Sequence, residues 1–159
     1  MSMSHVPAES GSFKVEISTS RSQSRAQGYL GIGNDELLDV LSQFEPFGLW
    51  RLDIDDGLTY WSDDAYLLHG MRPAEGPVDM VRAVRAYHPE DREHVMNCIE
   101  DAIRRRSGFR YVLRISMAGA PVRVIEATGL YRLNEAGQPE LIGTYRQVSK
   151  RVRSVEINS

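Results

Sequence analysis

Hydrophobic and polar residues alternate strictly in the last third of the chain. Between residues 109 and 117, Phe109, Tyr111, Leu113, Ile115 and Met117 face one way, while Arg110, Arg114 and Ser116 face the other. The segments 122–133 and 140–149 continue this strand pattern, and the turn sequences AGAP and NEAGQP separate the three. Earlier in the chain, FGLWRLD and LTYWS flank an Asp-Asp-Gly turn, which predicts a hairpin.

Helical periodicity appears in the segments between these strands. Residues 34–45 begin with Asn34, a good N-cap, and end before Pro46. Residues 89–107 begin with Pro89, carry acids in the first turn and arginines in the last, and stop at Gly108. Val95, Met96, Ile99, Ala102 and Ile103 are expected to share the apolar face of this long helix.

The order of these elements predicts the fold class. Helices lie between strand pairs and do not alternate with single strands, which is typical of an α+β domain. We expect a five-stranded antiparallel sheet with helices on one face and an amphipathic N-terminal helix. A cavity is expected between the long helix and the inner face of the sheet.

Three parts of the chain differ in composition. Residues 1–33 contain eight serines and read as a flexible tail, residues 34–150 form the domain, and residues 151–159 form a short C-terminal tail. Phe13–Ile17 alternates like a strand and could pair with an open sheet edge, in its own chain or a neighbour's. We favour the alternative, in which these few apolar residues belong to the tail.

Composition and charge narrow the function classes. The 159 residues are 42% hydrophobic and 26% charged, with a net charge of -3, so we expect no nucleic-acid or membrane partner. Cys98 is the single cysteine, which excludes an internal disulfide and favours a reducing, cytoplasmic location. Motifs of hydrolases, phosphate loops and zinc proteases are missing from the sequence, so we expect no enzyme.

Five sequence pieces in fixed order resemble the PAS domains of bacterial sensor proteins. These are FGLWRLD, YWSDDAYLLHGM, HPEDREHV, GFRYVLRI and RVIEATGLYRLNEAGQPELIGTYRQVSKR, and the resemblance covers residues 34–150. It implies a stand-alone sensory module with a pocket walled by residues 58–71. Two departures are Val124, where the family often has tryptophan, and Gln147-Val148-Ser149, where it usually has Asp-Ile-Thr.

Candidate pocket residues face the expected cavity. They are Trp61, His69, Met96, Ile99, Tyr111, Leu113, Ile125 and Tyr145. Some PAS proteins hold haem through a histidine of the long helix, but His94 lies away from the apolar stripe. The residues around Cys98 do not match flavin photosensors, and the acids between Asp53 and Asp64 fit turns and caps. We therefore expect no haem, flavin or metal.

The expected function is binding of an unknown small molecule or a separate signalling protein, followed by a conformational shift. The alternative is a ligand-free dimerisation or adaptor domain with a filled core. The outer sheet face should carry apolar residues that need a cover. We expect a homodimer in which the N-terminal helix supplies this cover, with Leu37, Leu38, Leu41 and Phe44 in the interface.

Overall fold

The chain folds around one antiparallel sheet in a computed structural model that describes residues 13–18 and 28–158. The sheet has six strands in the order β1-β4-β5-β6-β2-β3. Their bounds are β1 Val15–Ser18, β2 Phe47–Asp53, β3 Thr59–Trp61, β4 Gly108–Ile115, β5 Arg123–Leu133 and β6 Pro139–Gln147. The α+β class and the antiparallel sheet are thus confirmed.

The expected number of five strands is wrong because β1 adds a sixth. Val15 pairs with Tyr111 and Ile17 pairs with Phe109, so the alternating segment that we assigned to the tail completes the edge of the sheet at β4. Main-chain groups along an unpaired edge favour such an addition. The remaining residues of the expected N-terminal tail, 1–12 and 19–27, lie outside the described residues.

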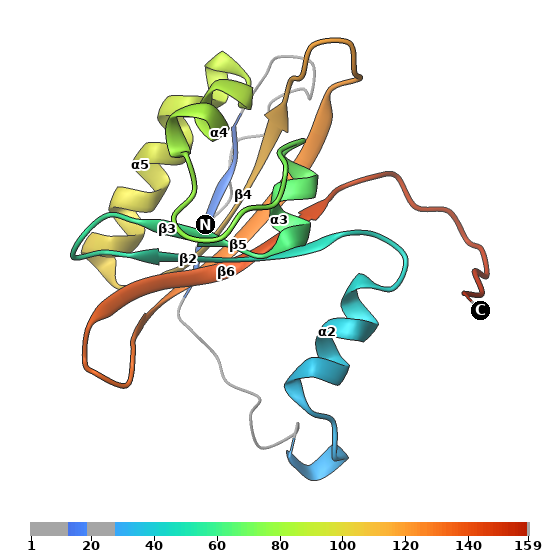
Figure 1. The fold of residues 1–159 in the computed structure, drawn as a ribbon, viewed down its shortest axis with the longest axis horizontal. Coiled ribbons are helices and arrows are strands. Elements are labelled where there is room, and N and C mark those ends of the chain that lie inside the picture. The colour runs from blue at the N-terminus through green and yellow to red at the C-terminus, as the bar shows by residue number, and fades with distance from the viewer. Residues whose placement is uncertain (1–12, 19–27, 159) are drawn as a thin grey trace.

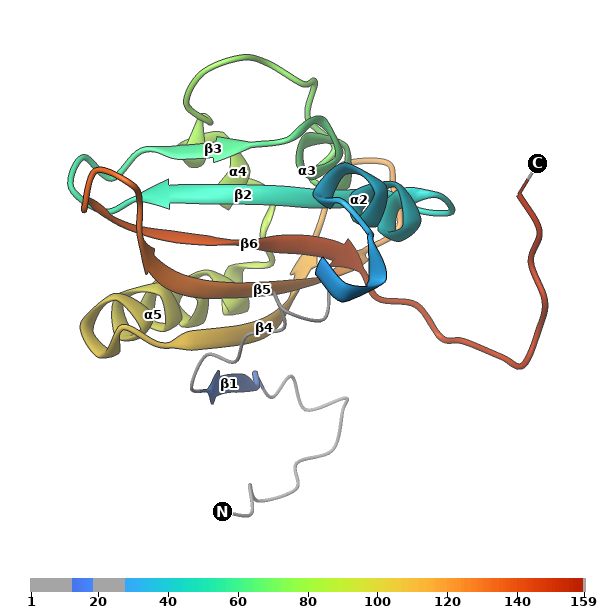
Figure 2. The same ribbon diagram turned by 90° about the horizontal axis from the view of Figure 1, so that it is seen from below.

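Besides a helical turn at 28–30, the structure has the helices α2 to α5, and three of them cover one face of the sheet. These three are α3 Asp63–Leu68, α4 Met80–Ala86 and α5 Pro89–Arg105. The fourth, α2 Asn34–Ser42, projects from the opposite side (Figures 1 and 2). It begins after Gly33, whose N–H donates to the Glu36 side chain, so the N-cap is Gly33 and not Asn34. The two faces of the sheet therefore differ, because helices cover one of them and leave the other uncovered.

The buried line of α5 differs from the expected one. Asp91, Val95, Cys98 and Ala102 are its buried residues, and they recur at intervals of three and four as an inward-facing stripe should. Met96 lies about 100° from Val95 around the helix and is 48% exposed, so its assignment to the pocket is wrong. Ile99 is only partly buried.

The middle of the sheet is built on two glycines without side chains. Trp50 of β2, Gly143 of β6 and Gly129 of β5 lie in one row across the strands, and the Trp50 ring comes within 2.6 Å and 2.7 Å of the positions that a Cβ at Gly143 and at Gly129 would take. A Cβ at Gly129 would lie 2.5 Å from the Phe109 ring. Gly129 thus makes room for two rings inside a regularly paired strand.

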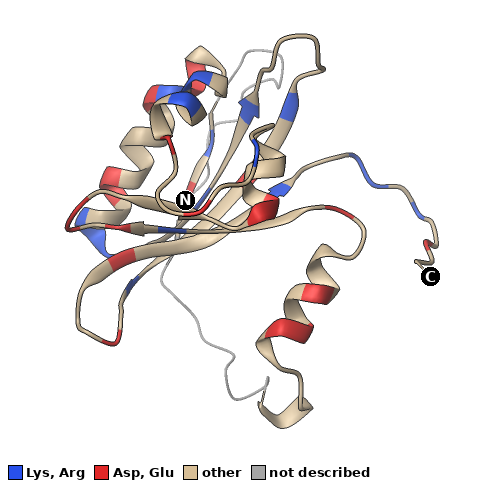
Figure 3. Cartoon of the chain, viewed as in Figure 1, with Lys and Arg blue, Asp and Glu red and all other residues tan. Residues whose placement is uncertain are grey.

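The C-terminal segment after β6 lies beside the end of α2. Arg151 forms an ion pair with Glu45 at 2.6 Å, and the Asn158 side-chain amide donates to the Gln43 carbonyl at 3.0 Å. Acidic side chains mark α2 and basic ones follow β6, as Figure 3 shows. Across the described ranges, no helix has the length and apolar content that crossing a membrane requires.

Candidate functional site

The inner face of the sheet surrounds a buried histidine. His69 follows α3, is 1% exposed, and makes a hydrogen bond with each ring nitrogen. Its Nδ1 lies 2.7 Å from the Ala65 carbonyl and its Nε2 lies 3.1 Å from the Tyr87 hydroxyl. Because a carbonyl oxygen only accepts, Nδ1 carries the proton and Nε2 is the acceptor in the neutral ring.

The local sequence explains how α3 holds this histidine in place. Gly48 of β2 lets α3 approach closely, since a Cβ there would lie 2.7 Å from the Ala65 backbone. Asp64 accepts the Phe47 N–H at 2.9 Å, which fixes the start of β2 to the first turn of the helix. At the other end, Arg123 of β5 donates to the carbonyls of Leu67 and Leu68, and so helps to satisfy the C-terminal end of α3.

Three tyrosines extend the polar chain from His69 across the core. The hydroxyl of Tyr145 hydrogen-bonds with those of Tyr87 and Tyr111. A consistent arrangement of protons has Tyr111 donating to Tyr145, Tyr145 to Tyr87, and Tyr87 to His69 Nε2. All three tyrosine side chains are buried, so the polar chain satisfies groups that would otherwise be costly to remove from water.

Burial shifts the pKa of every member of this chain toward its neutral form. The pKa of His69 falls to about 4, chiefly through loss of water, with a smaller contribution from the nearby Arg123 charge. Burial likewise raises the pKa of Tyr145 to about 12, and it raises the pKa values of Tyr87 and Tyr111 well above their ordinary value. The site is therefore a neutral hydrogen-bond network at physiological pH.

Trp61 closes the network on the β3 side. Its ring stacks on His69 with the centroids 4.0 Å apart and meets the edge of Tyr145 at 5.9 Å. Its buried indole Nε1 makes no well-aligned hydrogen bond within the described chain, although it lies close enough to the Tyr145 hydroxyl to lower that group's pKa. The Trp61 Nε1–H is thus the one buried ring donor of this network that could form a better hydrogen bond with an added acceptor.

Most of the predicted pocket residues meet in this region. Leu113 and Ile125 pair across β4 and β5, and both belong to the same core cluster as Tyr111, Tyr145 and Trp61. Ile99 lies at the border of the cluster, and Met96 lies outside it. The sequence analysis missed Tyr87, because its place at the end of a short helix gave no periodic signal, and Trp50, whose role depends on the cross-strand glycines.

A second candidate surface lies on the outer face of the sheet. An apolar hollow of about 430 Å³ is bordered by side chains of β2, β5 and β6 over the backbone of the central glycines. Its lining residues are Leu49, Trp50, Thr128, Gly129, Leu130, Arg132, Ile142, Gly143 and Thr144. The hollow is open to solvent because no described helix covers this face.

The interface residues predicted on α2 lie close to this face. Leu37, Leu41 and Phe44 are exposed, and no residue of α2 is buried. Leu41 and Phe44 border a smaller hollow of about 190 Å³ with Phe47, Arg146 and Arg151. The helix therefore presents an uncovered apolar stripe beside an uncovered apolar sheet.

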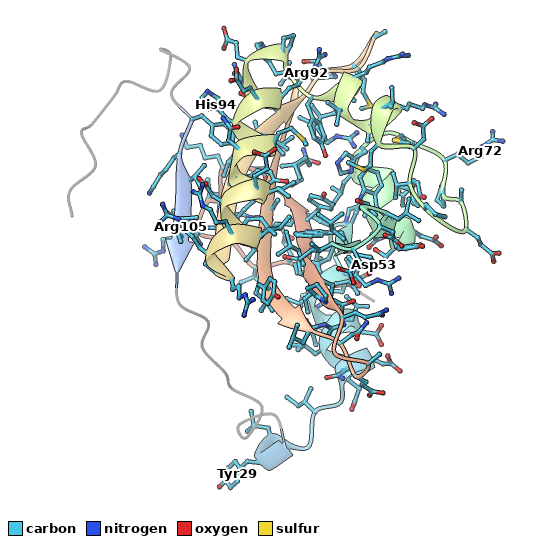
Figure 4. All side chains as sticks on the ribbon, turned by 90° about the vertical axis from the view of Figure 1, so that its left-hand side faces the viewer. Tyr29, Asp53, Arg72, Arg92, His94 and Arg105 are labelled. Carbon is cyan, nitrogen blue, oxygen red and sulfur yellow. The ribbon has the colours of Figure 1, made fainter. Side chains whose placement is uncertain are left out.

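The described residues contain no group of three or more His, Cys, Asp or Glu side chains that could hold a metal ion. His94 lies on the exposed side of α5, beside β1 and away from the core (Figure 4). Cys98 is buried, and burial, helped by Asp101, raises the pKa of its thiol to about 11, which disfavours a reactive thiolate.

Comparison with solved structures shows the same fold at low sequence identity. An RNA-binding Light-Oxygen-Voltage receptor matches with a TM-score of 0.59 and 20% identity over 70% of this chain, which spans only 32% of that receptor. A sensory box histidine kinase/response regulator from Burkholderia thailandensis matches with a TM-score of 0.55 and 20% identity, covering 73% of this chain and 85% of that one.

A third structure is a domain of a putative light and redox sensing histidine kinase from Haloarcula marismortui. It has a TM-score of 0.55 and 17% identity and covers 73% of this chain and all of that one. The comparison with curated proteins finds no match. The model of the family described as the PAS fold matches residues 58–145, more than half of the sequence. The chain therefore belongs to the PAS fold family.

Proposed function

We propose that this chain is a sensory module that works as a homodimer and passes a conformational change to a separate signalling protein. The observation that supports this most is the pairing of two uncovered apolar surfaces, the outer-face hollow and the α2 stripe. A monomer would leave both in contact with water, and a second copy can bury each against the other by two-fold symmetry.

The packed inner face favours this interaction role over binding of a large ligand. Trp50, Trp61, Tyr66, Phe109 and Tyr145 fill the space between helices and sheet with rings. Both hollows described above lie outside that core. This supports the reading of the domain as a dimerisation and signalling unit with a filled core.

Sedimentation equilibrium tests the proposal. We expect the mass of two chains, and we expect Leu41→Glu to give the 18.0 kDa of one chain by placing a charge in the apolar interface. Gln43→Glu is the matched control, because it adds the same charge at the exposed C-cap of the same helix, about 160° around the axis from Leu41. A monomeric wild-type protein, or a dimer that survives Leu41→Glu, would contradict the proposed interface.

A second candidate function is binding of a small polar ligand at the histidine–tyrosine chain. The Trp61 Nε1 donor supports it, since it lies near the Tyr145 hydroxyl without a well-aligned hydrogen bond, and a small ligand or water could accept that bond. Native mass spectrometry of the protein from its producing cells tests it. We expect added mass that Trp61→Phe abolishes, and a bare chain in both proteins would reject this candidate.

A further inference from the structure

The edge of the sheet at β4 carries a strand from a distant part of the sequence. β1 pairs with β4 over four residues, although about ninety residues separate them in the chain. In Figure 2, β1 lies beside β4 at one edge of the sheet, away from α2. Without β1, the alternating strand β4 would present unpaired main-chain groups to solvent.

Side chains make this edge selective for the sequence of β1. The Phe13 ring stacks on His94 of α5 with centroids 4.9 Å apart and lies 6.3 Å from Tyr111. Val15 packs against the core, and Glu16 forms an ion pair with Arg110 on the other face. The edge thus recognises an aromatic residue, an aliphatic residue two positions later and then an acid.

The strand is held loosely compared with the rest of the sheet. Phe13 and Val15 are half-buried and Ile17 is 42% exposed, whereas β5 and β6 pair over nine positions. Short pairing with partly exposed side chains gives little free energy against local opening. Among the strands of the sheet, β1 is therefore the one that we expect to open most easily.

Chain length does not dictate which copy's edge β1 must occupy. Residues 19–27 join β1 to the helical turn at 28–30 that precedes α2, and a segment of that length can span roughly 30 Å when extended. Every contact described above is available in a second copy, because that copy carries the same His94, Arg110 and Tyr111. Exchange of identical elements is a low-cost route to association.

We propose that the β4 edge and His94 form a strand-docking site that accepts residues 13–18 of a second copy, so that two copies exchange their β1 strands. The occupant is a second copy because its segment supplies the aromatic–aliphatic–acid pattern and the charge that complements Arg110. The inference involves self-association, as the proposed function does, but it does not depend on α2.

Disulfide trapping between two full-length chains tests the exchange. One chain carries Glu16→Cys and the other Arg110→Cys, both with Cys98→Ala, since Glu16 and Arg110 are directly paired across the strands. Mixing and oxidising them should give a cross-chain disulfide whose yield rises with protein concentration. The control pair, Ile17→Cys with Arg110→Cys, places the sulfurs on opposite faces of the sheet and should give several-fold less.

Further variants decide the interpretation. Phe13→Ala should lower the cross-chain yield several-fold by removing the stack on His94, and Lys14→Ala, at an exposed position, should not. Adding Leu41→Glu to both chains should leave the yield unchanged, which separates this site from the α2 interface. The proposal is overturned if the mixed pair gives no more cross-chain disulfide than its control pair at every concentration. A single chain that carries both Glu16→Cys and Arg110→Cys shows whether the two thiols can react. If that chain forms an internal disulfide and the mixed pair does not cross-link, β1 stays in its own chain.

Discussion

At the residue scale, His69 shows how burial turns an ionisable side chain into a neutral structural element. It donates one hydrogen bond, accepts another and stacks on Trp61, so its neutral form is satisfied without any counter-ion. An imidazolium in the same place would lose its acceptor role toward Tyr87 and would face no carboxylate in its immediate contacts. Protonation and folding are therefore in competition at this residue.

The stability of the protein should fall as the pH is lowered through this region. The pKa of His69 is 6.5 in a solvated chain and about 4 when folded, so between these values the unfolded state binds more protons. We expect a loss of about 2 kcal/mol from about pH 7 to about pH 5, measured by urea unfolding. His69→Gln should flatten this dependence, and an equally steep curve for that variant would contradict the assignment.

A buried carboxylate joins the long helix to the sheet edge. Burial alone would raise the pKa of Asp91, but hydrogen bonds from the side chain and backbone N–H of Arg114 outweigh it and leave that pKa lowered. Asp91→Asn should therefore cost about 1.5–3 kcal/mol of unfolding free energy.

Glu90→Gln provides the matched control for this variant. Glu90 also pairs with Arg114, at 3.1 Å, but its side chain is 66% exposed. Its loss should cost below about 1 kcal/mol, because water screens an exposed pair. Denaturant unfolding measures the loss of unfolding free energy for both variants. Equal losses would contradict the prediction that the buried Asp91 pair is stronger than the exposed Glu90 pair.

At the scale of elements, the sheet depends on glycines where rings cross the strands. Gly129→Ala should destabilise the fold by about 1–3 kcal/mol, since the new methyl group would push on Phe109 and Trp50 in a packed core. Gly28→Ala is the control, because nothing lies within 4 Å of its Cβ position. Thermal unfolding checks both, and an unchanged transition for Gly129→Ala would mean that the rings relax without cost.

The elements were predictable from the sequence to different degrees. Periodicity located β4, β5, β6 and α5 because each has a strict alternation or a well-capped helical stripe. It misplaced Met96, since a stripe defined by hydrophobicity alone does not reveal that Asp91 and Cys98 point inward. It also gave too little weight to β1, because pairing with a distant edge is a property of the assembled sheet and not of five local residues.

The candidate site was predicted less completely than the fold. Trp61, His69, Tyr111 and Tyr145 were expected to line one region, and they join in one network. The link between them is the Tyr87 hydroxyl, whose position is set by the end of α4 and by Arg92, which donates to the Tyr87 carbonyl. A contact that depends on the relative placement of two short helices leaves no pattern in the sequence.

At the scale of the whole molecule, we predict that the purified protein is colourless. His94 lies on the exposed side of α5, away from the core, and His69 uses both ring nitrogens in hydrogen bonds, so neither places a free imidazole nitrogen in the core for haem iron. The buried Cys98 lies in an environment that favours the neutral thiol. An absorption spectrum should show the aromatic band alone, and a Soret or flavin band would contradict this prediction.

The position of β6 in the sheet has a consequence for synthesis. β6 is the last strand made, yet it lies between β5 and β2 and joins the β4–β5 part of the sheet to the β2–β3 hairpin. A ribosome that has released only the residues before Pro139 presents two separate pieces with exposed strand edges. We therefore expect a chain that stops before Pro139 to expose unpaired strand edges and to aggregate, because β6 joins the two parts of the sheet.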